Sequence, residues 1–404
     1  MKKGIKVSEA IDVLLSLPVK LNTEQVSIGD AFCRVLAEDV SAAISYPPFD
    51  RSPFDGYAFR AEDVHSASKE NPVTLSINQE IPAGHASVCD IPPGHAAKIL
   101  TGAPIPAGAD TVVKFEDTEF TEKTVTLFGP ATAGKNIVLA GEDIIAGTIL
   151  ARKGEVISQA LMGLFASQGM KTVPVNKKPK ISILNTGTEL AELGAPLKPG
   201  MIYNSSTYTL RGFLFAMGAD FIDAGVVTDD EEQIAARVKT ELQIADMVIT
   251  TGGASVGDYD CAVRAAECAG AEILFWKIKM RPGGSLLAYV LDGKLVLSLS
   301  GNPGAAILGL LRLGLPYIRM LCGRKDVMPE ACRVRLAEEM TKKSEVPRVV
   351  RGYLDIRDGE AWFVENDGQG GGDISSFIRC DLLADIPENS SPLPKGSLVT
   401  AYRI

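Results

Sequence analysis

The sequence predicts a multidomain α/β plus β protein, with a central three-layer α/β domain built on a mostly parallel sheet. Between residues 178 and 323, strand patterns alternate with helical ones. This order is typical of parallel sheets covered by helices on both faces. On either side, short strand patterns and Pro/Gly turns become more frequent. At 404 residues the chain is also too long for one ordinary core, so we expect roughly two to four domains.

The central segment, residues 178–327, has five expected strands and helices between them. Asn204 and Ser205 are expected to cap one helix that stops near Gly218, because residues 210–217 repeat apolar side chains at helical spacing. Asp229 and Asp230 open an acidic first turn that suits the helix dipole. An apolar helix over residues 305–321 closes the unit. The expected strands are Ile181–Leu184, Ile222–Val227, Met247–Ile249, Ile273–Ile278 and Lys294–Leu299.

Three further domains are expected around this segment. Residues 1–46 and 144–177 have helical character and are predicted to form one discontinuous domain. Residues 47–143 are rich in Pro, Gly, Val and Thr, which predicts an inserted β-rich domain. Residues 328–404 alternate like strands over 348–356 and 361–365, which predicts a small β domain or barrel.

Composition narrows the class of protein. An apolar content of 46% with 23% charge is that of a soluble globular protein. The net charge of −9 disfavours bulk attraction to nucleic acid. The seven cysteines form no CxxC pair, so we expect neither a disulfide framework nor a structural zinc site, and we expect a reducing cytoplasm. No membrane span is expected, since the apolar run of residues 304–311 is broken by Arg312 and Pro316.

Polar loops follow the strands of the central segment. The strand ending at Ile249 runs into Thr250–Asp260, a Gly/Ser/Thr loop that ends in acids. Small side chains let backbone N–H groups approach an anion, and the acids could hold a divalent cation that bridges to it. A plain turn with Ser255 or Asp258 capping a helix is the alternative. Because ligands bind at the carboxyl ends of parallel strands, five such loops together predict a binding crevice. The other four are Asn185–Leu190, Thr228–Glu232, Arg281–Ser285 and Ser300–Pro303.

Several motifs resemble the MoeA family of molybdopterin molybdenumtransferases, which is similar to the C-terminal domain of gephyrin. In the central segment the similar stretches are Asn185–Leu190, Thr250–Asp260 and Gly301–Pro303. In the N-terminal half they are Pro47–Ala58, with its Asp-Gly-Tyr-Ala, Thr101–Pro106 and Gly141–Ile144. The resemblance covers essentially the whole chain in the family's order.

The resemblance implies an activity and an assembly. The family inserts molybdenum from molybdate into adenylylated molybdopterin and releases AMP, with a divalent cation such as Mg²⁺. It works as an elongated homodimer, in which the β domain of one subunit completes a site on the central domain of the other. The discontinuous helical domain then becomes a dimerisation segment, and the molybdopterin adenylyltransferase is a further possible partner. A different nucleotide-dependent enzyme is disfavoured, because neither a Gly-x-Gly-x-x-Gly nor a P-loop motif follows the first strand.

The resemblance also assigns roles. Asp55, Asp143, Thr101 and Arg281 are the expected catalytic residues, and Asp229, Asp230 and Asp260 the expected metal ligands. For most of these a plainer interpretation stays open: a turn acid, a helix first turn, a capping-box glutamate at Glu189, or a surface arginine at Arg351. The expected substrate-binding residues are Thr186, Gly187, Glu189, Gly252, Gly253, Ser255, Gly257, Pro282, Gly283, Ser285, Gly301, Asn302, Pro303 and Arg351.

One loop departs from the family. Arg281-Pro282-Gly283-Gly284-Ser285 stands where the family usually has Lys-Pro-Gly-Lys-Pro. Arg281 keeps a cation, whereas Gly284 removes one from the expected oxyanion corner, and Ser300 replaces a frequent proline nearby. Three interpretations are open: compensation by Lys277 or Lys279, a paralogue tuned to tungstate, or a non-catalytic molybdopterin-binding scaffold. The charge lost at Gly284 predicts an unusually high molybdate requirement, which Gly284→Lys is expected to lower.

Overall fold

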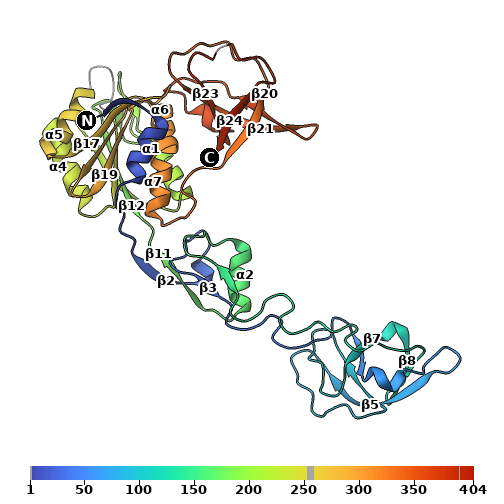
Figure 1. Cartoon of the computed structure of the whole chain (residues 1–404). Helices are drawn as coiled ribbons and strands as arrows, with labels where there is room; N and C mark the ends of the chain where they lie inside the picture. The colour runs from blue at the N-terminus through green and yellow to red at the C-terminus, as the bar shows by residue number, and fades with distance from the viewer. Residues whose placement is uncertain (1, 253–258, 391) are drawn as a thin grey trace. The chain divides into compact units, whose positions relative to one another are not determined.

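A computed structural model describes residues 2–252, 259–390 and 392–404, without the side chains of Tyr259 and Asp260. The chain forms two compact units (Figure 1). The first comprises residues 1–38, 153–157 and 173–404. The second comprises residues 39–152 and 158–172.

A seven-stranded sheet is the centre of the first unit. Its order is β1-β17-β18-β19-β16-β12-β15, and only β18 runs antiparallel to its neighbours among these strands. The prediction of a mostly parallel sheet is therefore confirmed. The strands are β1 (Lys2–Lys6), β12 (Lys180–Thr186), β15 (Asp220–Val227), β16 (Met247–Thr251), β17 (Glu272–Lys279), β18 (Leu287–Leu291) and β19 (Lys294–Leu299).

The antiparallel strand β18 was missing from the sequence prediction. It forms a tight hairpin with β19 through Asp292 and Gly293, which have φ angles of 51° and 76°. Two left-handed residues in an Asp-Gly pair are the usual turn of a two-residue hairpin. The Asp292-Gly293 dipeptide therefore indicated, in the sequence itself, the hairpin that contains this strand.

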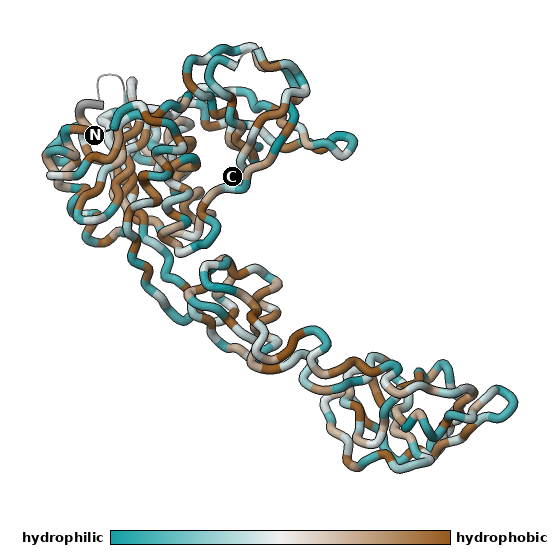
Figure 2. The backbone as a smooth tube through the Cα atoms, in the orientation of Figure 1, coloured by the Kyte–Doolittle hydropathy of each residue, from teal (hydrophilic) through white to brown (hydrophobic). Residues whose placement is uncertain are grey.

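Two apolar cores cover the two faces of the sheet. Ile183, Ile249 and Leu297 point into the core beneath α1, α3, α6 and α7. Their sequence neighbours, such as Leu184 and Val248, point into the core beneath α4 and α5. Successive side chains of a strand face opposite sides, so strands buried on both faces are predominantly apolar. Hydrophobic segments, drawn in brown, are accordingly frequent in this unit in Figure 2. The helices are α1 (Val7–Leu15), α3 (Ser206–Ala216), α4 (Glu231–Leu242), α5 (Tyr259–Ala269), α6 (Pro303–Gly309) and α7 (Leu315–Leu321).

The expectation of a helical N-terminus is wrong for most of residues 1–46. Lys2–Lys6 joins the edge of the seven-stranded sheet beside β17, and the nine residues of α1 form the one α-helix described there. Thr23–Ser27 is β2, whose alternating burial suits a strand, and it pairs with β11 (Thr172–Asn176). Neighbouring segments supply backbone partners for this stretch, so extended chain is favoured over helical hydrogen bonds.

The second unit is built on a six-stranded sheet of order β7-β4-β6-β5-β9-β8. Tyr57 and Phe59 lie in an apolar core on one of its faces, while Ala58 lies in the core on the other. Its helix is α2 (Gln159–Ser167), and Ser158 accepts the Leu161 N–H as its N-cap. The sheet strands are β4 (Gly56–Phe59), β5 (Val73–Ile81), β6 (His95–Ile99), β7 (Thr111–Lys114), β8 (Thr118–Phe120) and β9 (Thr124–Leu127), and β3 (Val40–Ser41) pairs with β10 (Ile149–Ala151).

The C-terminal residues close into a five-stranded barrel of order β20-β22-β21-β23-β24, as the strand patterns predicted. Arg312 ties it to the α/β domain: its Nη2 lies 2.7 Å from the Asp385 carboxylate, and its guanidinium stacks over Tyr402 at 4.2 Å. The barrel strands are β20 (Ala331–Leu336), β21 (Arg348–Arg357), β22 (Glu360–Glu365), β23 (Leu382–Ile386) and β24 (Leu398–Arg403).

Arg312 belongs to a π-helical turn, Leu310–Gly314, between α6 and α7. Among the described residues, the continuous helix Pro303–Leu321 is long and apolar enough to cross a membrane, which corrects the expectation that no segment would be. However, 83% of its most apolar window is buried inside the protein, as in the core helix of a globular domain.

The Arg312–Asp385 pair makes a prediction about stability. Burial raises the pKa of Asp385, and the charge and hydrogen bond of Arg312 offset this only in part. A carboxyl with a raised folded-state pKa stabilises most below its unfolded pKa and loses that contribution as the pH rises. We therefore expect Asp385→Asn to cost within about 1 kcal/mol at neutral pH, and Arg312→Met about 1–3 kcal/mol, because the latter leaves a half-buried carboxylate unpaired.

Urea unfolding followed by fluorescence checks this, since Trp362 lies in the barrel and Trp276 in the sheet. Arg335→Met is the matched control, because its ion pair with Glu360 is exposed on the barrel. Equal losses for Arg312→Met and Arg335→Met would contradict the assignment.

Candidate active site

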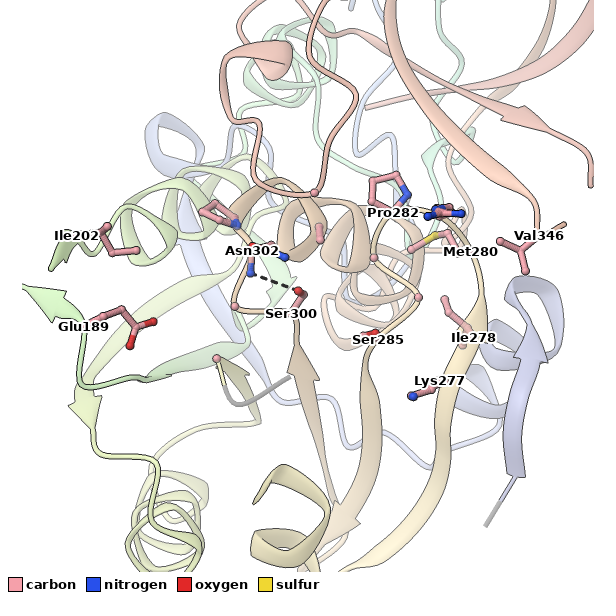
Figure 3. A pocket seen from close by; sticks show the side chains of 18 residues that line it. Glu189, Ile202, Lys277, Ile278, Met280, Pro282, Ser285, Ser300, Asn302 and Val346 are labelled. Carbon is pink, nitrogen blue, oxygen red and sulfur yellow. Dashed lines mark hydrogen bonds between the residues drawn. The ribbon is translucent and has the colours of Figure 1, made fainter. Parts of the chain in front are cut away.

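A cavity of about 730 Å³ opens at the carboxyl ends of the sheet strands (Figure 3). Gly252 follows β16, Ser300–Pro303 follows β19, and Arg281–Ser285 joins β17 to β18. Glu189 and Ile202 stand on one side, with Lys277 and Val346 across from them (Figure 3). The crevice predicted from the polar loops is therefore present as a cavity.

Many of the sequence-predicted residues meet in this cavity, but not all of them. Thr186, Gly187 and Arg351 do not line it, nor do Asp229 and Asp230. Gly253, Ser255 and Gly257 lie outside the described residues, as does the side chain of Asp260. The predicted residues that do line it are Glu189, Gly252, Arg281, Pro282, Gly283, Ser285, Gly301, Asn302 and Pro303.

Close backbone approach explains the glycines on the floor of the cavity. Gly252 has a φ of 100°, and a Cβ there would lie 2.1 Å from the carbonyl oxygen of Thr186. A Cβ on Gly301 would lie 3.2 Å from the Cα of Gly252. Only glycine allows these three strand ends to come so close. Thr186 thus contributes by shaping the floor, although it does not line the cavity.

Glu189 is not a capping-box residue. It lies in a turn before the two-residue strand β13 (Leu190–Ala191), which pairs with β14 (Ile202–Tyr203), so no helix begins there. Gly187 has a φ of 141°, and a Cβ on it would lie 2.5 Å from the Glu189 Oε2. The glycine therefore leaves room for an exposed carboxylate at the edge of the cavity.

Asp230 caps a helix, as the plainer interpretation held. Its Oδ1 accepts the Gln233 N–H at 2.8 Å at the start of α4. Among the described residues, no three His, Cys, Asp or Glu side chains come close enough to hold a metal ion. The role of Asp229, Asp230 and Asp260 as metal ligands stays a prediction.

Arg351 is neither a surface residue nor part of the cavity wall. Its side chain has 0% exposure, and its guanidinium donates to the Gln369 side chain and to the carbonyls of Gly370 and Asp373. Burial lowers its pKa from the usual arginine value, in part offset by Asp373. We therefore correct its expected role: it holds the loop of residues 368–373, whose Gly371 lines the cavity.

The altered loop is incompatible with a side chain at Gly284. A Cβ there would lie 2.4 Å from the Met280 carbonyl oxygen and 2.6 Å from that of Ile278. The expected gain from Gly284→Lys therefore cannot be tested cleanly, because the substitution would displace the backbone. Of the two lysines expected to compensate, Lys277 lines the cavity and Lys279 does not.

Asp55 and Thr101 lie together in the second unit. Asp55 Oδ1 accepts both the backbone N–H and the hydroxyl of Thr101, each at 2.7 Å. These two bonds, the backbone one first, lower the pKa of the exposed Asp55. Asp55 is therefore an ionised carboxylate at neutral pH, suited to accept a proton or bind a cation rather than to donate a proton.

The segment that carries Asp143 is joined to the same corner by the backbone. The Asp143 N–H donates to the Tyr46 carbonyl at 3.1 Å, and the Arg51 N–H donates to the Val138 carbonyl at 2.9 Å. The Ser52 N–H in turn donates to the Ala103 carbonyl at 3.0 Å. Residues 46–55, 101–104 and 138–144 thus form one connected surface.

The family resemblance implied that the C-terminal domain contributes Arg351 and the Gly368–Ser376 segment, and Gly371 of that segment lines the cavity. Val346, which was missed, also lines the cavity, although it lies more than 40 residues beyond the last polar loop of the sheet. No local pattern marks Val346, because its place depends on how the barrel packs on α6. Met280 and Ile202 were also missed, as ordinary apolar residues.

Comparison with known proteins fits these observations. Three family models match in order: the MoeA N-terminal region (domain I and II) over residues 5–169, a probable molybdopterin binding domain over 182–320, and the MoeA C-terminal region (domain IV) over 333–404. The chain is 32% identical over 398 residues to the molybdopterin molybdenumtransferase of Staphylococcus aureus strain MSSA476, covering 98% of this chain and 95% of that one.

The chain belongs to the MoeA family of molybdopterin molybdenumtransferases. It is therefore a transferase of molybdenum cofactor biosynthesis. Two crystal structures of the molybdopterin biosynthesis MoeA protein from Pyrococcus horikoshii agree, with TM-scores of 0.85 and 0.84 at 30% and 28% identity. Each covers 99% of this chain.

Gly252 makes a prediction about the floor of the cavity. In Gly252→Ala the new Cβ would collide with the Thr186 carbonyl, and the positive φ would add backbone strain. Gly270 has a φ of 75° and no neighbour within 4 Å, so Gly270→Ala would add the backbone strain alone. We expect Gly270→Ala to cost about 1–2 kcal/mol and Gly252→Ala clearly more, about 3 kcal/mol or above. Urea unfolding followed by Trp276 fluorescence measures both, and equal costs would exclude the close approach.

Thr101 makes a prediction about the Asp55 carboxylate. Thr101→Val removes the hydroxyl bond but keeps the backbone one, so the pKa of Asp55 should rise and still remain below its ordinary value. A carboxyl ¹³C NMR titration measures this. Thr126→Val is the control, because the Thr126 hydroxyl bonds only the Thr74 hydroxyl among the contacts described. An unchanged Asp55 titration would show that the hydroxyl bond is absent in solution.

Proposed function

We propose that this transferase inserts molybdenum from molybdate into adenylylated molybdopterin and releases AMP. The cavity at the carboxyl ends of the sheet is the observation that carries the proposal. Its glycine-lined floor suits a diphosphate, since backbone N–H groups reach an anion where side chains are small. Its size of about 730 Å³ is within the usual range for a site that encloses a small ligand.

The walls of the cavity supply complementary chemistry. Glu189 offers an exposed carboxylate that could accept from the amine and amide edge of a pterin. On the far side Arg281 and Lys277 supply cations, and Ser285 and Ser300 supply hydroxyls. A ligand with a pterin at one end and phosphates or an oxyanion at the other would match this division.

A homodimer with shared active sites is part of the proposal. Asp55, Thr101 and Asp143 form the second catalytic surface, which the partner subunit would supply. On α3, Tyr208 is 52% exposed and Phe215 is 79% exposed. They are seven residues apart, so they lie on the same face of the helix. Exposed aromatic side chains gathered on one face often mark an interface between subunits.

Mg²⁺ is proposed as a cofactor on the acids near the cavity. The described side chains alone do not assemble a site for it. When bound, it would neutralise phosphate charge. Glu189 lines the cavity, and Asp229, Asp230 and Asp260 are the carboxylates that the family resemblance implies as ligands.

Two alternatives remain. A tungstate-specific paralogue is favoured by the altered loop, where Gly284 stands in place of a lysine. A non-catalytic molybdopterin-binding scaffold would keep the cavity but would not need the Asp55–Thr101 pair.

Activity is tested with purified protein, adenylylated molybdopterin, Mg²⁺ and either molybdate or tungstate, with AMP release measured. We expect release with molybdate, and a loss of about a hundredfold or more in Asp55→Asn, because a positioned carboxylate contributes on this scale. Asp90→Asn, an exposed acid on a loop of the same unit, serves as the control. Equal turnover in Asp55→Asn and wild type would refute the catalytic role, and release with tungstate alone would select the paralogue.

The shared site is tested with the same assay. Mixed Asp55→Asn and Asp260→Ala subunits should regain part of the activity if each site takes one residue from each chain. No recovery, after subunit exchange has been demonstrated separately, would assign both residues to a site within one chain.

A further inference from the structure

We propose that the oxyanion of the reaction is held by four cations in a second, smaller cavity, and that three of them come from the barrel rather than from the altered loop. The inference rests on the proposed function for the identity of the anion. This basic cavity, of about 240 Å³, is lined by Arg281, Lys342, Lys343, Ser344, Arg348 and Gln369, together with neighbouring backbone. It shares Arg281, Pro282 and Gly371 with the larger cavity.

Among the described residues, no carboxylate forms an ion pair with the cations of the basic cavity. None of its lining residues is acidic. Within the described part of the chain, Arg281, Lys342, Lys343 and Arg348 form no ion pair with a carboxylate, unlike Arg312 or Arg335. Glu365 interacts electrostatically with two of the cations: burial raises its pKa, and Arg348 and Lys342 offset this in part. Glu365 does not line the cavity.

The backbone holds two of these cations side by side. The Arg281 N–H donates to the Pro347 carbonyl, and the Val349 N–H donates to the Arg281 carbonyl, each at 3.0 Å. Arg281 is thereby paired in register with Arg348, which is only 8% exposed. The Arg348 Nη1 donates to the Lys342 carbonyl at 3.1 Å, which draws the lysine loop toward it. Like charges held together repel, and a bound anion relieves that repulsion.

The chemistry of the cluster selects a small, multiply charged oxyanion. Guanidinium groups bind planar pairs of oxygens, and ammonium groups bind as point charges, so together they suit a tetrahedral dianion. The volume is sufficient for such an ion. Molybdate, tungstate and sulfate share this shape and charge, so the experiment must separate them.

The geometry of the altered loop explains why the cations come from elsewhere. The backbone around Gly284 leaves no room for a side chain, since a Cβ there would meet two carbonyl oxygens at 2.4 and 2.6 Å. A lysine at that position would need a different loop conformation. Lys342 and Lys343 reach the same corner from the barrel, and Arg281 stands at the boundary of the two cavities.

The test measures anion binding directly, by equilibrium dialysis of the full-length protein against molybdate, tungstate or sulfate at low ionic strength. The exposed pair is replaced in Lys342→Gln/Lys343→Gln, while Lys342→Arg/Lys343→Arg keeps the charge. The matched control is Lys178→Gln/Lys180→Gln, which removes two exposed lysines at the amino ends of the sheet strands, away from the cavities. Thermal melts confirm that each variant is folded.

We expect the glutamine pair to weaken molybdate binding about tenfold or more, because two charge-assisted contacts are lost. The arginine pair should bind within about threefold of wild type, and the control pair should be unchanged. Wild-type affinity in the glutamine pair, or an equal loss in the control pair, would overturn the proposal. Tighter binding of sulfate than of both metal oxyanions would also overturn it.

The same variants separate this inference from the proposed function. If wild type releases AMP with molybdate and the glutamine pair needs no more molybdate than wild type, the function stands and the basic cavity is not its oxyanion site. If wild type binds the oxyanion in a manner that depends on the lysines but never releases AMP, the proposed function fails while the binding site remains.

Discussion

One fully buried arginine holds the candidate site together. The guanidinium of Arg351 bonds the Gln369 side chain and the carbonyls of Gly370 and Asp373, so it fixes the loop of residues 368–373. Gly371 of that loop accepts the Ala305 N–H at 2.8 Å, at the start of α6. At Gly304 a Cβ would lie 2.8 Å from the Asp373 carbonyl oxygen. The barrel can therefore approach the sheet edge only because position 304 lacks a side chain.

The packing of the barrel loop, residues 368–373, on the start of α6 shapes both cavities. It brings Gly371 and Val346 into the wall of the larger cavity, and it sets Arg348 beside Arg281. A buried guanidinium whose three nitrogens each donate a hydrogen bond is costly to break, because a lone charge would be left in a nonpolar environment. The site therefore depends on an interaction that does not touch it. The Arg312–Asp385 pair supports the contact between the barrel and the α/β domain from the middle of the long helix.

Several elements could be predicted from sequence because their signals are local. The strands ending at Thr186, Val227, Thr251 and Leu299 were found from short apolar runs, since a strand buried on both faces must be apolar. The polar loops that follow these strands were predicted to form a binding crevice because the carboxyl ends of parallel strands lie at one edge of the sheet. The antiparallel strand β18 was missed although the Asp292–Gly293 turn marked it, and residues 1–46 were misassigned because their strand partners lie more than 100 residues away.

The sequence by itself determined the family, the strand ends that form the cavity, and the pairing of chemical types such as Asp55 with Thr101. These predictions rest on motifs, which can be recognised in the sequence without knowledge of which residues contact one another. Only the tertiary structure decided that Arg351 supports the site from behind, that Gly284 cannot carry a side chain, and that the barrel brings Lys342, Lys343 and Arg348 next to Arg281. The physical reason is that burial and charge balance depend on which surfaces pack together, and that packing is set by contacts between residues far apart in the chain.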